Sequence, residues 1–163
     1  MKLLCDEMLK GLARWLRAAG YDTVIADGET DRELLEQALR ENRLLLTRDR
    51  HLARYTDAPG HVCLLEGDNL DAWARQLRRR HIDWLHRPLS RCLLCNLPLQ
   101  TVTHPIAHLP PDVRDGPLCH CPGCGRIYWR GGHARRMLDR LQRWQNGPLY
   151  STGASDYDGP VED

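Results

Sequence analysis

The sequence predicts an α/β fold in which a parallel sheet is flanked by helices and followed by a small cysteine-rich module and a C-terminal helix. Two observations predict it. Short apolar runs alternate with helix-like repeats over residues 1–86, and the second half of the chain carries two C-x-x-C motifs. Strands that alternate with helices of roughly 10 to 12 residues are typical of parallel sheets with crossover helices.

The first predicted strand and helix span residues 2–20. Residues 2–5 form a short apolar run typical of a buried strand. The next apolar residues, Leu9, Leu12, Ala13 and Leu16, recur at helical spacing. Gly20 then supplies a residue that readily ends a helix in the left-handed conformation.

A second strand, a second helix and a third strand follow. Residues 23–26 and 44–47 are the two strand-like runs. Between them, Thr30 and Glu33 fit a capping box that opens a helix ending at Asn42. The apolar stripe of this helix consists of Leu34, Leu35, Ala38 and Leu39.

The remaining elements set the predicted domain boundaries. Residues 62–65 predict a fourth strand, and Leu70, Trp73, Ala74 and Leu77 mark the helix after it. We place this first domain at 1–86 and the cysteine-rich module with the last helix at 87–146. Residues 147–163 are acidic and rich in small residues, which predicts a disordered tail.

Composition excludes few functions. The 163 residues are 42% hydrophobic and 28% charged, as in soluble globular proteins. A net charge of +1 gives no global indication of a nucleic-acid partner, so any argument from charge must be local. No apolar run approaches the ~20 residues of a membrane span, and the N-terminus lacks a signal-peptide pattern. We therefore expect no membrane partner and a cytoplasmic protein.

Aspartates follow two of the predicted strands. Asp6 comes directly after the first. In "LLLTRDRHL", residues 44–52, the apolar run stops at Asp49, which stands between Arg48 and Arg50. In open parallel sheets, ligands bind outside the carboxyl ends of the strands. Asp31, in the first turn of the second helix, belongs at the same rim. Three carboxylates there would repel one another unless a cation lay between them, and Mg²⁺ takes oxygen ligands of this kind.

Each aspartate alone also has a structural explanation. Asp31 suits the positive end of its helix dipole. Asp6 would cap the first helix, and Asp49 would pair with a neighbouring arginine. The coincidence of all three at one rim favours the metal site.

The two C-x-x-C motifs predict a zinc site. Their cysteines are Cys92, Cys95, Cys121 and Cys124, a set typical of a tetrahedral Cys₄ site that is structural because it leaves no open position. Each motif is followed by a residue that tolerates positive φ, Asn96 or Gly125. The alternative is a set of unmetallated core or redox thiols.

The other cysteines do not fit this spacing. Cys119 and His120 are alternative potential ligands, but Cys119 breaks the C-x-x-C spacing, so we interpret Cys119 as a residue outside the metal site. Cys5 and Cys63 lie inside apolar runs, where a thiol behaves as a small buried hydrophobe.

Arginine-rich segments flank the cysteine module. Residues 75–91 and 126–143 carry six arginines each, and Tyr128 and Trp129 lie within the second segment. Basic residues interleaved with aromatic ones suit phosphate contact and base stacking. The alternative is a solvated helix face with buried apolar residues behind it, which would be Met137, Leu138, Leu141 and Trp144.

Together these motifs resemble the Mut-seven C-terminal ribonuclease family, in which a PIN-like fold precedes a zinc ribbon. The resemblance rests on "LLCDEMLKGLARWLRAAGYDT", "DRELLEQA", "LLLTRDRHL", the two cysteine motifs and "GRIYWRGGHARRM", and covers about residues 1–144. It implies a metal-dependent nuclease that hydrolyses RNA phosphodiester bonds. Asp6, Asp31 and Asp49 would be its catalytic residues and would hold Mg²⁺ or Mn²⁺.

The resemblance also implies substrate contacts. Arg14, Arg48 and Arg50 would bind phosphates. The zinc ribbon would assist RNA binding, through residues that include Tyr128, Trp129 and Arg130. PIN nucleases commonly use a fourth acid, for which Asp27, Asp68 and Asp71 are candidates near predicted strand ends.

Two other functions compete with a nuclease. One is an RNA- or ribosome-binding zinc-ribbon protein whose PIN-like half is idle. It would bind RNA with a steep salt dependence and cleave nothing. The other is a metal-dependent phosphatase, but "CDEML" lacks its spaced pair of acids and no lysine follows Lys10.

Overall fold

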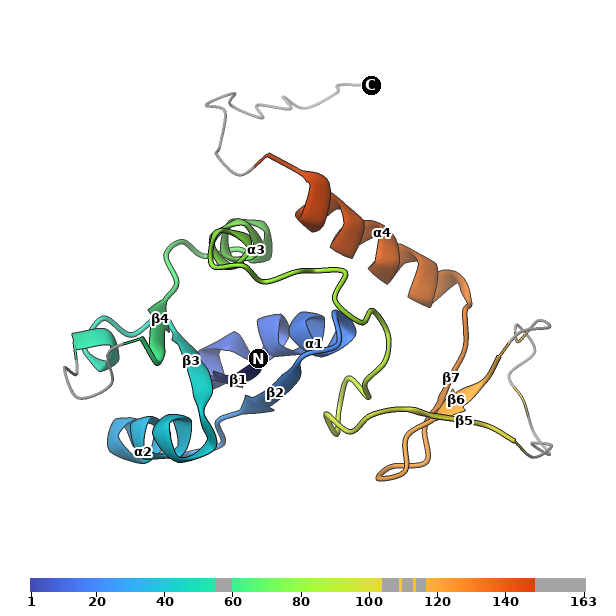
Figure 1. The fold of residues 1–163 in the computed structure, drawn as a ribbon, viewed down its shortest axis with the longest axis horizontal. Helices are drawn as coiled ribbons and strands as arrows, with labels where there is room; N and C mark the ends of the chain where they lie inside the picture. The colour runs from blue at the N-terminus through green and yellow to red at the C-terminus, as the bar shows by residue number, and fades with distance from the viewer. Residues whose placement is uncertain (55–59, 104–108, 110–112, 114–116, 149–163) are drawn as a thin grey trace, which may run out of the picture.

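The computed structural model describes residues 1–54, 60–103, 109, 113 and 117–148. Its main sheet is parallel and has the strand order β2-β1-β3-β4, with helices on both faces (Figure 1). The strands are β1 (Lys2–Cys5), β2 (Asp22–Ile25), β3 (Arg43–Thr47) and β4 (Val62–Leu64). The predicted α/β fold is confirmed, and each strand lies within one residue of its expected bounds.

The helices also follow the sequence signals. A 3₁₀ turn, η1 (Glu7–Leu9), precedes α1 (Lys10–Ala18), and α2 (Asp31–Glu41) opens with the predicted capping box at Thr30. Gly20 and Asn42, which follow α1 and α2, have φ of 98° and 51°. The others are η2 (Leu52–Arg54), α3 (Leu70–Arg79) and α4 (Gly132–Asn146). None of the described helices has the length and apolar character needed to cross a bilayer.

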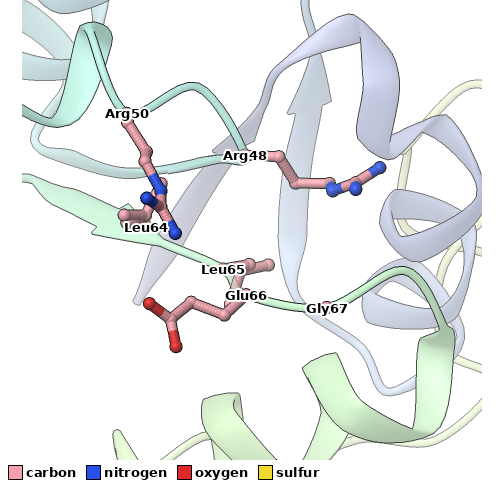
Figure 2. Close-up of a pocket in the computed structure, with 6 residues that line it drawn as sticks. All are labelled: Arg48, Arg50, Leu64, Leu65, Glu66 and Gly67. Carbon is pink, nitrogen blue, oxygen red and sulfur yellow. The ribbon is translucent and has the colours of Figure 1, made fainter.

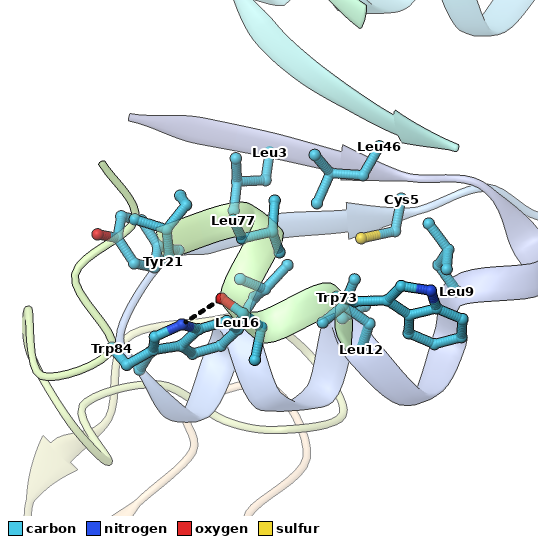
Figure 3. Close-up of a cluster of buried hydrophobic side chains, with 14 of the residues drawn as sticks. Leu3, Cys5, Leu9, Leu12, Leu16, Tyr21, Leu46, Trp73, Leu77 and Trp84 are labelled. Carbon is cyan, nitrogen blue, oxygen red and sulfur yellow. Dashed lines mark hydrogen bonds between the residues drawn. The ribbon is translucent and has the colours of Figure 1, made fainter. Parts of the chain in front are cut away.

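Two apolar cores lie on the two faces of the sheet. Because side chains alternate along a strand, Leu3 and Cys5 face one core while Leu4 faces the other. The larger core packs β1, β3 and β4 against α1, α3 and α4. Figure 3 shows part of it, with Leu3 and Leu46 of the strands near Leu12, Leu16 and Leu77 of the helices. The smaller core is closed by α2, through Leu34, Leu35 and Ala38.

The C-terminal helix returns to the first half of the chain. Its buried residues Met137, Leu141 and Trp144 belong to the larger core, while Leu138 is half-buried. The Trp144 ring lies 5.0 Å from the ring of Trp15 on α1 and 4.8 Å from that of Trp84. The apolar stripe expected on this helix is therefore present, and it packs on the sheet domain. The boundary at 86/87 stays a prediction.

The second half of the chain forms a small antiparallel sheet. It consists of β5 (Gln100–Thr101), β6 (Cys119–His120) and β7 (Ile127–Tyr128), in that order (Figure 1). The first C-x-x-C turn precedes β5, and the second lies between β6 and β7. The tail expected to be disordered lies, from residue 149 onward, outside the described residues.

Candidate functional site

Two of the predicted aspartates, Asp6 and Asp49, follow the carboxyl ends of the central strands, β1 and β3. The Asp6 amide donates to the Leu46 carbonyl at 3.0 Å and so extends the pairing of β1 with β3. Thr47 Oγ1 donates a 2.7 Å hydrogen bond to Asp6 Oδ2 and accepts one of 2.9 Å from the backbone amide of Asp49. Thr47 is fully buried. One hydroxyl therefore connects the two predicted catalytic aspartates.

The alternative role of Asp6 is also realised. Its Oδ1 accepts from the Met8 amide at 2.7 Å and caps η1. With both oxygens hydrogen-bonded and the residue only 8% exposed, Asp6 is held in one orientation. Capping and rim placement are thus compatible, since the cap fixes the direction in which the carboxylate points.

Asp31 reaches the same rim through His51. Asp49 Oδ1 accepts from the His51 amide at 2.7 Å, which turns the chain back, and His51 Nδ1 approaches Asp31 Oδ2 at 3.8 Å. Asp31 lies in the first turn of α2, as expected. His51 was not among the predicted site residues. The sequence feature that could have indicated His51 is its position two residues after Asp49. An aspartate side chain commonly accepts a hydrogen bond from the backbone amide two residues further on.

The donor set suits a hard divalent ion that keeps part of its water. Mg²⁺ binds oxygen at 2.0–2.1 Å, so two oxygens on opposite sides of one ion lie about 4.2 Å apart. Within the described residues, the three aspartates do not form a group whose oxygens could together hold one metal ion. Mg²⁺ usually binds one or two carboxylates and several waters. Asp6 and Asp49 keep free lone pairs for this role, because a carboxylate offers about four.

A pocket of about 150 Å³ opens beside Asp49. It is lined by Arg48, Arg50, Leu64, Leu65, Glu66 and Gly67 (Figure 2). Figure 2 shows the Arg48 and Arg50 side chains leaving the loop in different directions, with Glu66 facing the Arg50 side. A pocket lined by two arginines next to Asp49 in the sequence can take a phosphate group.

Glu66 is an acid that the sequence analysis missed. Thr47 pairs with Leu64 in the sheet, so Asp49 and Glu66 each stand two residues beyond this pair, at the same end of neighbouring strands. Of the acids proposed instead, Asp71 accepts from Trp144 Nε1 at 2.6 Å and from Arg140 at 3.2 Å, which joins α3 to α4. Asp27 and Asp68 are exposed. Only the strand register, which is not visible in the sequence, distinguishes Glu66.

The other residues predicted to contact RNA differ from one another in exposure and in hydrogen bonding. Arg14 and Arg130 are exposed, on α1 and just before α4. The Tyr128 hydroxyl donates to Cys92 Sγ at 3.1 Å and accepts from the Leu93 amide at 3.3 Å. Trp129 is half-buried, and its Nε1 is buried without a hydrogen-bond partner among the described residues. Roles for these residues in RNA binding stay predictions.

The four predicted cysteines form one cluster. A sulfur atom from each of Cys92, Cys95, Cys121 and Cys124 lies within 4.8 Å of the others. Cys92 Sγ and Cys124 Sγ are 3.8 Å apart, and a tetrahedral ion with metal–sulfur bonds of 2.3 Å would place sulfurs about 3.8 Å apart. The group can therefore hold a metal ion.

The turns and the electrostatics of this cluster suit metal binding. Asn96 and Gly125 have φ of 63° and 69°, as their places after the motifs predicted. Burial alone would raise the pKa of the Cys92 thiol, but hydrogen bonds from Tyr128 and from the Cys95 and Leu94 amides lower it to about 6. The thiolate is the form that binds metal. Cys119 and His120 lie in β6, outside the four-sulfur group.

Cys5 and Cys63 behave differently. Both are fully buried, and desolvation raises the pKa of both thiols. A thiol that stays protonated is a poor nucleophile and a poor ligand. These two cysteines are packing residues, as the sequence indicated.

The first cysteine turn is attached to the edge of the main sheet. Arg17 on α1 is buried, and its guanidinium donates to the Leu93 and Leu94 carbonyls at 2.9 and 2.7 Å. The amide of Thr23, in edge strand β2, donates to Asn96 Oδ1 at 3.0 Å. This turn therefore satisfies a donor of the exposed edge of the sheet, where unpaired amides would otherwise remain.

Comparison with known proteins identifies a family. The family described as Mut7-C RNAse domain matches residues 1–141. A Homo sapiens protein described as "Exonuclease mut-7 homolog" is 34% identical over 102 residues, which are 58% of this chain and 12% of the human protein. The chain thus spans a small part of the length of this relative. No solved structure matches the chain.

Proposed function

This chain belongs to the Mut7-C RNAse domain family, and from that premise we propose that it is a metal-dependent ribonuclease that hydrolyses RNA phosphodiester bonds at the rim formed by Asp6, Asp31 and Asp49. The observation that carries the proposal is the Thr47 hydroxyl, which joins Asp6 to Asp49 beside a pocket with two arginines. That the sheet domain has a PIN-like fold is also part of this proposal.

The residues of the rim would divide the chemistry between them. Asp6 and Asp49 would hold Mg²⁺ or Mn²⁺, with Asp31 and Glu66 as further acids nearby. Such an ion lowers the pKa of a bound water and stabilises the leaving oxygen of a phosphodiester. Arg48 and Arg50 would neutralise the substrate phosphates and hold them against the carboxylates, which otherwise repel them.

The cysteine cluster would hold zinc in a structural role. Four thiolates fill a tetrahedral site and leave no position for water or substrate. The contacts of Arg17 and Asn96 attach this site to β2 and α1 rather than to the rim. We therefore assign the zinc to stability and to shaping an RNA-binding ribbon.

An idle RNA-binding protein is the alternative function. The observation in its favour is that, in the part of the chain that the structure describes, the three aspartates do not form a group that could together hold one metal ion. It predicts RNA affinity that falls steeply with salt, and no cleavage with any divalent ion.

Cleavage of end-labelled single-stranded RNA tests the proposal. The protein would be incubated with Mn²⁺, Mg²⁺ or EDTA, beside an Asp6→Asn/Asp49→Asn variant whose fold is checked by circular dichroism. We expect cleavage that requires a divalent ion and is lost in the variant. Binding without cleavage in both proteins would instead establish the idle binder, and equal cleavage in both would place the chemistry elsewhere.

Elemental analysis tests the zinc assignment separately. Protein purified without chelators should contain about one equivalent of zinc, and a Cys92→Ser/Cys95→Ser variant should contain almost none. Less than half an equivalent in the wild type would contradict the Cys₄ zinc site. Cys119→Ser is the matched control, because Cys119 lies outside the four-sulfur group.

A further inference from the structure

Arg48 is held by an aromatic ring from another element. Its guanidinium carbon lies 5.5 Å from the ring centroid of Trp73, which belongs to α3. Cations within about 6 Å of a tryptophan ring are attracted by its electron-rich face. Arg48 is half-buried, whereas Arg50 across the pocket is exposed. The two arginines that flank Asp49 are therefore not equivalent.

Trp73 also fixes the opposite wall of the pocket. Its Nε1 donates to the Gly67 carbonyl at 3.2 Å. Three residues later on α3, Gln76 accepts from the Glu66 amide at 2.9 Å and donates to the Glu66 carbonyl at 2.7 Å. The loop after β4 is thus hydrogen-bonded to α3 at two successive residues, and Trp73 contacts both sides of the pocket.

The core holds Trp73 itself in place. It is 7% exposed and packs in the larger core near Leu9 and Leu12 (Figure 3). A buried indole loses little conformational freedom when a guanidinium rests on it, because its rotamer is already fixed by packing. The entropy cost of ordering the long Arg48 side chain is reduced accordingly.

We propose that Trp73 is a positioning residue that holds the Arg48 guanidinium in the orientation that binds a substrate phosphate beside Asp49. This inference rests on the proposed function, because it assigns Arg48 to an RNA phosphate. Trp73 does not touch the substrate. It acts through Arg48, while Arg50 supplies charge from a freer side chain.

The test measures RNA binding without divalent ions and cleavage kinetics with Mn²⁺ for Trp73→Leu, Trp73→Phe and Arg48→Ala. Trp73→Leu should weaken binding and raise KM by about two- to tenfold with little change in kcat, since a uniformly used phosphate contact is lost. Trp73→Phe keeps an aromatic face and should recover most of the affinity.

Salt dependence separates positioning from charge. Arg48→Ala should reduce the slope of log Kd against log salt by about 0.7, the value for one phosphate contact to a single strand. Trp73→Leu removes no charge, so its affinity should fall with the slope unchanged. The double variant should bind no more weakly than Arg48→Ala alone, because the effect of Trp73 passes through Arg48.

Trp84→Phe is the matched control. Trp84 lies in the same core and also donates its Nε1 to a backbone carbonyl, that of Ala74, at 3.1 Å. It should lose stability without a change in RNA affinity. Equal losses of affinity for Trp84→Phe and Trp73→Leu, or fully additive effects of Trp73→Leu and Arg48→Ala, would overturn the inference.

The binding arm separates this inference from the proposed function. A wild type that binds RNA but does not cleave it would refute the nuclease, and the affinities and salt slopes would still decide the role of Trp73. A wild type that neither binds nor cleaves RNA would overturn both.

Discussion

Thr47 sets the geometry of the rim with a single hydroxyl. It donates to Asp6, accepts from the Asp49 amide, and is shielded from water. A hydroxyl can do both at once because it carries one donor and two acceptor lone pairs. The placement of the Asp6 carboxylate and of the Asp49 backbone therefore depends on a residue that has no acid–base role of its own.

Replacing Thr47 by valine should disturb the rim while preserving the shape of the side chain. Asp6 Oδ2 and the Asp49 amide would each lose a partner, which costs about 1–3 kcal/mol when the group is buried. We expect cleavage to fall by at least about tenfold. Urea unfolding and cleavage assays measure the two effects. Thr47→Ser keeps the hydroxyl and should retain most of both, and wild-type activity in the valine variant would contradict this role.

Asp22 should make the stability of the fold dependent on acid. Burial raises the pKa of its carboxyl, but hydrogen bonds from Arg43 and Asn96 outweigh burial and leave the pKa below its usual value. A carboxyl whose pKa is lower in the folded state stabilises the protein above its ordinary pKa, about 3.9, and loses that contribution as pH falls below it.

Asp22→Asn is the corresponding variant. It should be less stable than the wild type in urea at pH 7, and the difference should shrink as the pH is lowered through 4 to 3. A difference in unfolding free energy that stays constant over this range would show that the charge of Asp22 contributes nothing.

Sequence reasoning located the strand-end acids but not the residues between them. Asp6 and Asp49 follow apolar runs, so their placement at one rim follows from the parallel sheet alone. The roles of Thr47 and Glu66 depend on register and on side-chain direction across two strands, which no local pattern in this chain encodes.

At the scale of elements, the first cysteine turn and edge strand β2 stabilise each other. Asn96 ends the turn in the left-handed conformation, accepts from the Thr23 amide, and donates to Asp22 Oδ1 at 2.7 Å. The positive φ was predictable from the motif. The contact with β2 was not, since it joins polar groups more than 70 residues apart.

Asn96→Gly separates the backbone role of this residue from its side-chain role. Glycine keeps the left-handed conformation at no steric cost but removes both hydrogen bonds to β2. We expect a loss of about 1–3 kcal/mol in the unfolding free energy, measured by urea denaturation. Gly125→Asn is the control, because a side chain there meets nothing within 4 Å and asparagine tolerates positive φ. Equal stability of Asn96→Gly and wild type would show that the attachment to β2 is energetically neutral.

For the last helix too, the local sequence pattern was predictable and the tertiary contacts were not. Its apolar stripe was visible at helical spacing, whereas its packing against Trp15 and Trp84 was not. Arg140 covers this aromatic group, 5.2 Å from the Trp15 ring and 4.9 Å from the Trp144 ring. At least one arginine of the 126–143 segment thus serves packing.

For the whole molecule, metal binding and folding should be coupled. The cysteine turns lie between the main sheet and α4 in the sequence, and both flanking parts share one core. If the cysteine cluster holds zinc as proposed, its removal by a chelator should lower the melting temperature of the entire chain, because a structural metal contributes directly to folding free energy. The Thr23 amide, which donates to Asn96 of the first cysteine turn, should then exchange its hydrogen faster than in the untreated protein. Unchanged melting after complete zinc removal would contradict this coupling.

The central claim is that the carboxylate rim binds a divalent ion that supports RNA cleavage. The most direct test is the Mn²⁺ concentration dependence of cleavage by protein already loaded with zinc. We predict no cleavage with zinc alone, a saturable rise with Mn²⁺, and a half-maximal Mn²⁺ concentration at least about tenfold higher in Asp6→Asn but unchanged in Asp27→Asn. Cleavage with zinc alone, or an identical Mn²⁺ dependence in Asp6→Asn and wild type, would contradict it.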